Sequence, residues 1–243
     1  MTKAVGQDET LDILCEDSLR IIQRRDGYRF SIDAILLANF VTFKKHERLL
    51  DIGSGCGIMP IYMSKKGYVN KMLGVEIQKD LYDASLRNKT LNYCDNVDFI
   101  CGDITSWAQT LKRSPFHVVI SNPPYTKERT GRKSPYHSRL VARYETSLHL
   151  SDLISVSSSL LYKKGRFYVI YPSRRLGELI NVAASYKLEA KRLRFVHPKK
   201  NEGANLFLAE FIKEGGVGTS VEQPLYIFEN SRYTDEVKGY YAL

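Results

Sequence analysis

The sequence predicts an α/β fold built on a doubly wound, mostly parallel sheet of seven strands, with an antiparallel pair at one edge. Short apolar strands alternate with helical segments from Arg48 onward, which is the rhythm of successive βαβ units. Four polar residues, Asp51, Glu76, Asp103 and Asn122, stand at or just after the ends of four of these strands. Ligands of such sheets bind at the carboxyl ends of the strands, so we expect these residues to meet in one cleft.

The first 47 residues are predicted to form an extension that packs on a core domain of residues 48–243. Two short apolar runs, residues 13–15 and 19–23, read as a small hairpin, and residues 32–43 as an amphipathic helix. A chain of 243 residues is long enough for one well-buried α/β domain with small extensions of this kind.

A glycine-rich turn follows the first core strand, which ends at residue 52. Gly53, Gly55 and Gly57 allow the backbone to approach a ligand closely, and the next helix, residues 58–66, offers free amides at its start. The spacing is Gly-x-Gly-x-Gly, and Ile58 stands where the third glycine of a dinucleotide-binding turn would be. Asp51 at the strand end suits a cationic ligand better than a pyrophosphate, which favours S-adenosylmethionine as the cofactor.

The next two strands supply further candidate cofactor residues. Residues 72–76 end in Glu76, which is expected to accept hydrogen bonds from ribose hydroxyls or, alternatively, to cap the helix that begins near residue 79. Its neighbour Ile77 is included as a cofactor contact. Residues 97–101 precede Asp103 and Ile104, which are expected to accept from the adenine amino group and to cover the adenine ring, respectively.

The sequence Asn122-Pro123-Pro124-Tyr125 directly follows the apolar strand at residues 116–121. Two prolines fix the backbone and remove two donors, so the free carbonyl groups become acceptors in a rigid turn. The Asn122 side chain adds an acceptor and Tyr125 a flat face for stacking. This arrangement is suited to holding a planar amino or amide nitrogen for methylation, and these four residues are the predicted catalytic site.

The second half of the chain continues the alternation. Residues 146–162 and 176–186 are expected to be helical, and residues 165–171, 190–196 and 205–212 to be strands. The last two strands follow one another without an intervening helix, which predicts the antiparallel pair. A turn at residues 215–218 precedes the apolar run 225–228, and the polar tail beyond it reads as a C-terminal extension.

Taken together, these motifs resemble the class I S-adenosylmethionine-dependent methyltransferases with the Asn-Pro-Pro-Tyr motif. More narrowly, the chain is similar to bacterial tRNA adenine-N6 methyltransferases, which act on the adenine 3′ of the anticodon in a valine tRNA. Residues 27–37, 142–145, 233–236 and 240–243 carry the closer resemblance. It implies a Rossmann-like methyltransferase sheet and methyl transfer to the N6 amino group of an adenine in RNA, most simply tRNA.

Rival functions share this chemistry. Release-factor glutamine methyltransferases also use Asn-Pro-Pro-Tyr, but they carry a helical N-terminal domain and a Glu-Pro pair after the motif, which this sequence lacks. DNA adenine methylation is disfavoured because no separate target-recognition domain is recognisable. Guanine N2 in ribosomal RNA stays open, although Phe is more usual than Tyr at the fourth motif position. A non-catalytic RNA-binding module is the alternative outside enzymes.

Charge is distributed unevenly along the chain. Residues 1–121 contain 16 Lys/Arg and 15 Asp/Glu, whereas residues 122–243 contain 20 and 12. A polyanionic substrate accounts for this asymmetry, because phosphate contacts dominate nucleic-acid affinity. Two basic stretches, residues 127–143 and 187–200, are interpreted as a positive wall at the mouth of the site. The residues assigned to RNA are Lys127, Arg129, Arg132, Lys133, Arg143, Lys199 and Lys200.

Other features exclude some classes of protein. No apolar run approaches the roughly 20 residues that span a bilayer, and the polar N-terminus lacks a signal-peptide core, so a cytoplasmic protein is expected. The four cysteines and five histidines show no metal-binding spacing, so no metal is expected. The oligomeric state and the identity of the RNA cannot be predicted from the sequence.

Overall fold

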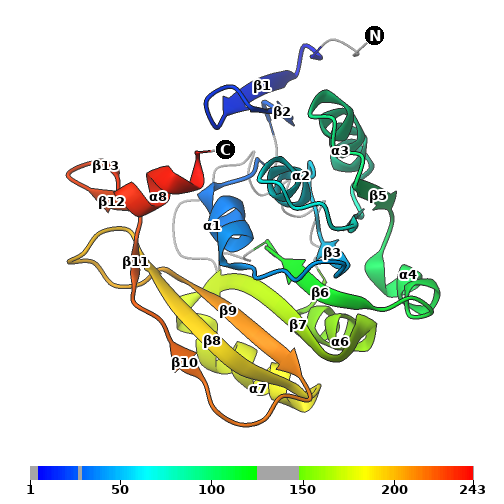
Figure 1. Ribbon diagram of the computed structural model, residues 1–243, viewed down its shortest axis with the longest axis vertical. Helices are drawn as coiled ribbons and strands as arrows, with labels where there is room; N and C mark the ends of the chain where they lie inside the picture. Colours follow the sequence, from blue (N-terminus) through cyan, green and yellow to red (C-terminus); the bar gives the residue numbers. More distant parts are fainter. Residues whose placement is uncertain (1–4, 27–28, 125–147, 243) are drawn as a thin grey trace.

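The computed structural model describes residues 5–26, 29–124 and 148–242. Within them, a central sheet of nine strands runs in the order β10-β8-β9-β7-β6-β3-β4-β5, and β11 also pairs with β8 (Figure 1). The strands are β3 (Leu49–Ile52), β4 (Met72–Glu76), β5 (Val97–Cys101), β6 (Phe116–Ser121), β7 (Leu161–Pro172), β8 (Leu188–His197), β9 (Leu206–Lys213), β10 (Ser220–Val221) and β11 (Leu225–Tyr226).

The predicted doubly wound, mostly parallel sheet is confirmed, with a difference at its edge. Strand β9 is antiparallel to both of its neighbours, β7 and β8. Strand β8 therefore runs in the same direction as β7 and the rest of the sheet. The predicted pair does not form a bare edge, because the short strands β10 and β11 pair in parallel with β8.

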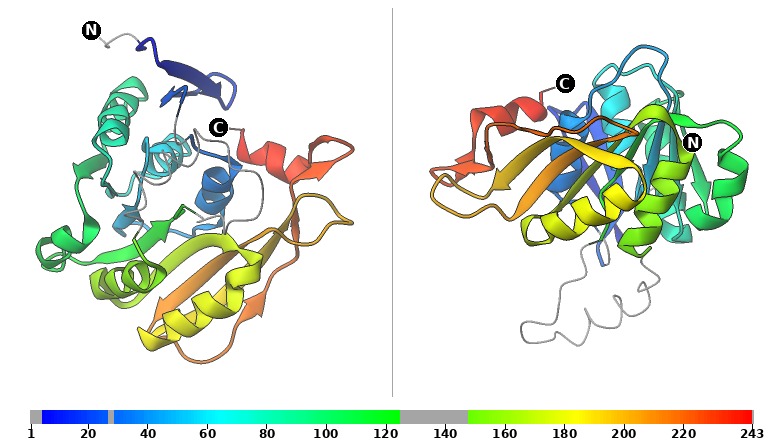
Figure 2. Two further views of the ribbon diagram at one scale, coloured as in Figure 1. Left: turned by 180° about the vertical axis from the view of Figure 1, so that it is seen from behind. Right: turned by 90° about the horizontal axis from the view of Figure 1, so that it is seen from below.

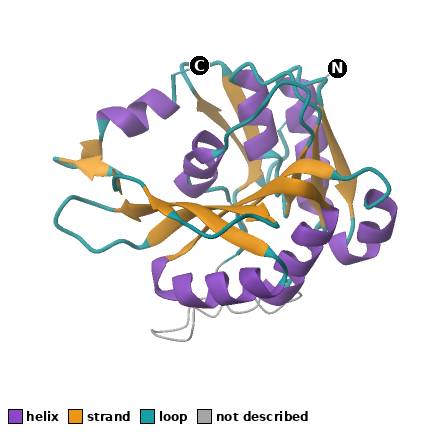
Figure 3. Ribbon diagram, turned by 60° about the horizontal axis from the view of Figure 1, so that its bottom comes forward, coloured by secondary structure: helices purple, strands orange, loops and turns teal. Residues whose placement is uncertain are grey.

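Helices cover both faces of the sheet (Figures 2 and 3). Between the helices and the sheet lie two apolar cores. One core joins the sheet to α1 (Ile32–Phe40), α2 (Ile58–Lys65) and α3 (Lys79–Leu91). The other joins it to α4 (Ile104–Leu111), α6 (Leu150–Leu160) and α7 (Leu176–Ser185). Alternate residues of a strand point to opposite faces, so in β7 Phe167 enters the second core and Tyr168 the first.

The N-terminal hairpin consists of β1 (Glu9–Leu14) and β2 (Leu19–Arg24), which pair antiparallel and lie apart from the central sheet. Leu19 and Ile21 of β2 are fully buried in the same core as α1 and α2. Both strands are longer than predicted, because β1 alternates half-buried and exposed residues and so lacks a continuous apolar run. The proposed division at residue 47 stays a prediction.

Two short helices and a hairpin were not predicted. Helix α4 begins at Ile104, and helix α8 (Asp235–Tyr240) follows a hairpin of β12 (Phe228–Glu229) and β13 (Arg232–Tyr233). The polar tail is therefore ordered. Thr234 caps α8 by accepting from Val237 N, and the Val237 side chain is fully buried against the first core.

Candidate active site

The glycine turn joins β3 to α2, and its three glycines serve different purposes. Gly53, Gly55 and Gly57 all have positive φ angles, of 75°, 57° and 83°, where other residues are strained. A Cβ at Gly57 would lie 2.6 Å from the Phe99 ring, so this glycine is required by packing. A Cβ at Gly53 would meet no atom within 4 Å, so the backbone there faces open space that a ligand can enter.

Asp51 lies in β3, immediately before this turn, and is fully buried. Neither of its carboxylate oxygens has a hydrogen-bond partner in the described part of the chain. Burial raises the pKa of the Asp51 carboxyl well above its usual range, and the Glu76 charge raises it further. A buried acid without a donor costs stability, and nearby positive charge on a bound ligand would offset that cost.

Glu76, at the end of β4, braces the turn. Its Oε2 accepts from Gly55 N at 2.8 Å, and its Oε1 accepts from Gln78 N at 2.9 Å at the start of α3. Burial raises the pKa of Glu76, while these backbone hydrogen bonds oppose the rise. Glu76 thus contacts the residue that precedes α3, Gln78, and the capping alternative stays a prediction. Each oxygen still has a second lone pair, so the ribose contact stays a prediction.

The structure places the other three predicted cofactor contacts, Asp103, Ile77 and Ile104, in different surroundings. Asp103 caps α4, with Oδ1 accepting from Thr105 N and Thr105 Oγ1, both at 2.8 Å, so that Oδ2 takes no part in the cap. Ile77 is 49% exposed, which leaves an apolar surface for a ring. Ile104 is buried in the second core, which leaves little of its surface to cover a ligand.

Asn122 follows β6 and lines one cleft with the glycine turn. The cleft is bounded by Phe30, Ala34, Gly53, Ser54, Gly55, Cys56, Ile58, Met59 and Asn122. The end of β6 is fixed to the end of β3, because Ser121 Oγ donates to Ile52 O at 2.9 Å. The predicted catalytic asparagine and the predicted cofactor turn are thus brought together. Pro123 and Pro124 continue from it, half-buried and exposed, and Tyr125 lies outside the described residues.

Several residues of this cleft were not predicted as contacts, among them Ser54, Ile58 and Met59 of the turn and α2. Two more come from a segment farther back in the chain. Phe30 and Ala34 lie just before and within α1, in the segment that carried the resemblance without being given a role. Their neighbour Asp33 is partly buried, and burial raises the pKa of its carboxyl. The signal for this wall was the apolar, Asp-containing entry into α1, but nothing in its spacing indicated that it faces the glycine turn.

Behind the turn, Asn88 of α3 and Asn92, the C-cap residue of that helix, hold the N-terminal hairpin. Asn92 accepts from Arg20 N and donates to Arg20 O, and Asn88 does the same with the Ile22 backbone. These bonds satisfy the free edge of β2. Asn88 alone also donates to Cys56 O, at 3.0 Å, inside the glycine turn. This side chain therefore joins hairpin, helix and cofactor turn.

The interpretation of residues 187–200 as one positive wall is wrong in part. Arg192 pairs with Glu210 and Glu222, and Arg194 pairs with Glu236, so both charges are neutralised within the fold. Lys187 lies where β8 begins, at the opposite edge of the sheet from Asn122. Lys199 and Lys200 are exposed in the loop after β8, at the edge that carries Asn122.

The other assigned RNA residues, Lys127, Arg129, Arg132, Lys133 and Arg143, lie outside the described residues.

No helix in the described ranges is both long and apolar enough to cross a membrane. No group of three or more His, Cys, Asp or Glu side chains in those ranges is arranged to hold a metal ion.

The chemistry of the groups around the glycine turn suits S-adenosylmethionine. The open backbone at Gly53, the unpartnered Asp51 carboxylate beneath the turn and the acidic strand ends at Glu76 and Asp103 suit a ligand with a sulfonium, an ammonium and a ribose. The acidic groups around the turn suit a cationic ligand better than a pyrophosphate.

Known proteins show the same architecture. A crystal structure of a predicted O-methyltransferase from Agrobacterium tumefaciens aligns with a TM-score of 0.69 at 21% identity, over 86% of this chain and 97% of that one. A methyltransferase from Pyrococcus furiosus aligns with a TM-score of 0.55 at 16% identity, over 80% and 89%. At these identities the likeness establishes the fold.

Sequence relatives have more specific names. A protein of Porphyromonas gingivalis named tRNA1(Val) (adenine(37)-N6)-methyltransferase is 29% identical over 68% of this chain, which spans 65% of that relative's length. A relative from Shewanella halifaxensis with the same name is 24% identical over 90% of this chain and 89% of its own. The family model of the methyltransferase small domain matches residues 31–177, from the start of α1 to the start of α7. The chain therefore belongs to the methyltransferase small domain family.

Proposed function

We propose that this protein transfers a methyl group from S-adenosylmethionine to the N6 amino group of an adenine in RNA, in the tRNA anticodon loop next to the anticodon. The observation that carries the proposal is the cleft in which Asn122 lies beside the glycine turn. The names of the relatives from Porphyromonas gingivalis and Shewanella halifaxensis support adenine and tRNA as the targets. We place this activity in the cytoplasm, where tRNA is modified.

The chemistry requires positioning more than a dedicated base. Bound S-adenosylmethionine supplies a methyl group made electrophilic by its sulfonium. Asn122 and the Pro123 carbonyl accept from the two hydrogens of the amino group, which holds its nitrogen in line with that methyl group and favours a pyramidal nitrogen. Such alignment can contribute roughly 7–11 kcal/mol to lowering a barrier. After transfer the nitrogen is strongly acidic and loses its proton to water.

The target adenine must leave its stack to reach this cleft. Extrusion costs a few kcal/mol and least for a base that is already unpaired, which favours a loop over a duplex. Tyr125 is assigned the stacking face for the extruded base.

The first test is the Asn122→Ala variant. Removal of the side-chain acceptor should lower kcat by about 100-fold or more, because small misplacement in the reacting geometry costs that much. The dissociation constant for S-adenosylmethionine should change by less than about threefold. Asn181→Ala, on the exposed surface of α7, is the matched control and should retain full activity. Collapse of cofactor binding in Asn122→Ala would contradict the assigned role.

The substrate is tested with labelled S-adenosylmethionine and separate RNA and protein fractions from cells that lack this gene. N6-methyladenosine in the digested tRNA fraction is the expected product, identified by mass spectrometry. Label in the protein fraction would assign the site to glutamine methylation, and label on guanine would move the target to another exocyclic amino group.

A further inference from the structure

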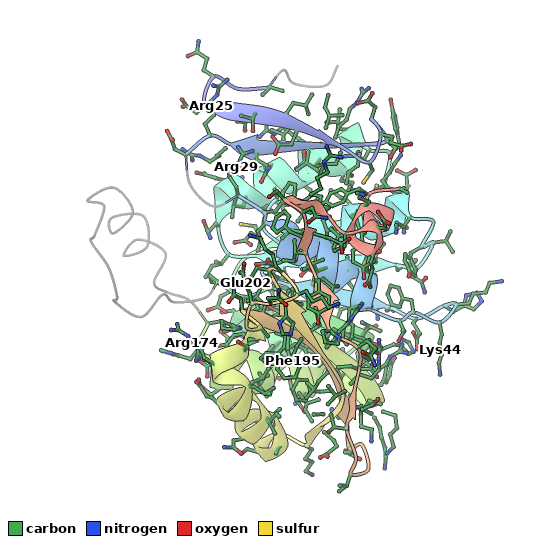
Figure 4. The ribbon with its side chains drawn as sticks, turned by 90° about the vertical axis from the view of Figure 1, so that its left-hand side faces the viewer. Arg25, Arg29, Lys44, Arg174, Phe195 and Glu202 are labelled. Carbon is green, nitrogen blue, oxygen red and sulfur yellow. The ribbon has the colours of Figure 1, made fainter. Side chains whose placement is uncertain are left out.

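The edge of the sheet that carries Asn122 extends to the C-terminal hairpin. Strands β6, β7, β8 and β11 run parallel, so the segments that follow them all leave the sheet at the same edge. Neighbouring strands lie about 4.8 Å apart, so β11 is four spacings, or about 19 Å, from β6 across the sheet. The strand register places β11, and the hairpin that follows it, farther along the strand direction than the end of β6. Figure 4 shows Arg174, after β7, and Glu202, after β8, on one side of the molecule, with Lys44 on the opposite side.

The hairpin presents a stack of three aromatic rings. Phe228 and Tyr233 are cross-strand partners, with ring centroids 5.2 Å apart and planes at 17°. Tyr241 stacks on the other side of Tyr233, with centroids 5.9 Å apart and planes at 9°. Phe228 is 37% and Tyr233 38% exposed. Flat rings held nearly parallel at a surface offer a face on which a base can stack.

This stack is held rigidly by the end of the chain. Arg194 of β8 donates to both carboxylate oxygens of Glu236 in α8, and Tyr62 of α2 donates to the Tyr240 carbonyl. Thr234 N donates to Ile227 O at 3.0 Å and closes the base of the hairpin. A two-stranded hairpin of this size is not stable alone, so its rings keep their positions through these anchors. Rings fixed before binding lose little entropy when a ligand arrives.

Cations lie beside the stack. Phe228 N donates to Pro198 O at 2.9 Å, which places the hairpin directly against the loop that carries Lys199 and Lys200. Arg232 stands on β13, opposite Glu229. Lys200 and Arg232 are exposed, and neither has an ion-pair partner within the residues that the structure describes.

We infer that the Phe228–Tyr233–Tyr241 stack is a second nucleotide-binding site, which takes an unpaired base of the RNA substrate while Lys200 and Arg232 contact the adjoining phosphates. The inference rests on the proposed function. Exposed aromatic rings next to cations are the combination that binds unpaired RNA, because every base has a flat face and every nucleotide a phosphate. The stack lies beyond β8 from Asn122, and the strands between them fix the distance from the stack to Asn122.

The test compares two RNAs by direct titration: a stem–loop with an unpaired adenine in its loop, and a fully paired duplex of the same length. Phe228→Leu keeps an apolar side chain in the hairpin and removes the flat face. It should raise the dissociation constant for the stem–loop about 5- to 150-fold and leave duplex binding and the salt dependence unchanged. Arg232→Gln should instead reduce the slope of log affinity against log salt by about 1.

Matched controls lie at the opposite edge of the sheet. Tyr162→Leu removes a 42% exposed ring where β7 begins, and Lys44→Gln removes one positive charge from the far side shown in Figure 4. Both variants should bind the stem–loop like the wild type. Thermal unfolding and S-adenosylmethionine affinity should be unchanged in all four variants.

The outcomes separate this inference from the proposed function. If the wild-type protein methylates RNA but Phe228→Leu and Arg232→Gln behave like their controls, the second site is wrong and the proposed function stands. If the wild-type protein neither binds nor methylates RNA, the proposed function itself fails. If Phe228→Leu abolishes a dimer seen by light scattering while RNA affinity is unchanged, the stack belongs to a contact between copies, and the inference is overturned.

Discussion

Asp51, a predicted cofactor residue, is buried in a way that costs the fold stability. The carboxyl is fully buried without a donor among the described residues, and its pKa is raised above that of an aspartate in an unfolded chain. The folded state therefore holds its proton more tightly than the unfolded state. Stability is lost as pH rises from about 4 through the raised folded pKa, because the unfolded chain then ionises more readily.

The Asp51→Asn variant should therefore be more stable than the wild type without cofactor at pH 8, and the difference should shrink toward pH 4. Each kcal/mol corresponds to about 2–4 °C in Tm for a chain of this size. Cofactor affinity should fall, because the negative charge beneath the turn is lost. Thermal unfolding at several pH values and calorimetry with S-adenosylmethionine measure the two effects.

Asp98→Asn is the control for this change. Asp98 lies in β5 with a side chain 76% exposed and paired with Lys89, so the substitution should alter stability little at either pH. If the Tm of Asp51→Asn changes with pH in the same way as that of the wild type, the buried carboxyl does not lower the stability of the fold as predicted.

At the scale of elements, the N-terminal hairpin and the glycine turn are connected through α3. Asn88 and Asn92 make equivalent pairs of hydrogen bonds to β2, but only Asn88 also reaches Cys56 O. Replacing either asparagine removes hydrogen bonds to the hairpin, but only replacing Asn88 also removes the hydrogen bond to the glycine turn. The two variants can therefore be compared directly.

Asn88→Ala should lower stability by about 1–3 kcal/mol, because it leaves the buried backbone groups of Ile22 unpaired. Asn92→Ala should lower stability less, because its partner Arg20 is exposed and water can replace the lost hydrogen bonds. Only Asn88→Ala should also weaken S-adenosylmethionine binding, by about tenfold, because the Cys56 carbonyl and the turn around it are released. Chemical denaturation and calorimetry distinguish the effects. Equal loss of cofactor affinity in both variants would mean that hairpin docking, and not the Cys56 contact, shapes the turn.

For the whole molecule, the sequence predicts the sheet well because its strands are apolar runs that end in polar residues, as at Asp51 and Glu76. The cleft between Asn122 and the glycine turn follows from the rule that parallel strands end at one edge. Contacts between distant segments could not be predicted. The pairing of Arg192 with Glu210 and Glu222, for example, depends on two strands that meet only in the folded sheet, so a basic run was taken for an exposed surface.

Asn88 and Asn92 also govern when the protein can complete its fold during synthesis. The β1–β2 hairpin leaves the ribosome early, but the side chains that satisfy its free edge are 66 and 72 residues farther along the chain. At a synthesis rate of 5–20 residues per second, that interval is about 3–14 s. During it, the backbone groups of Arg20 and Ile22 have no native partner, so the newborn N-terminus depends on water or a chaperone until α3 emerges.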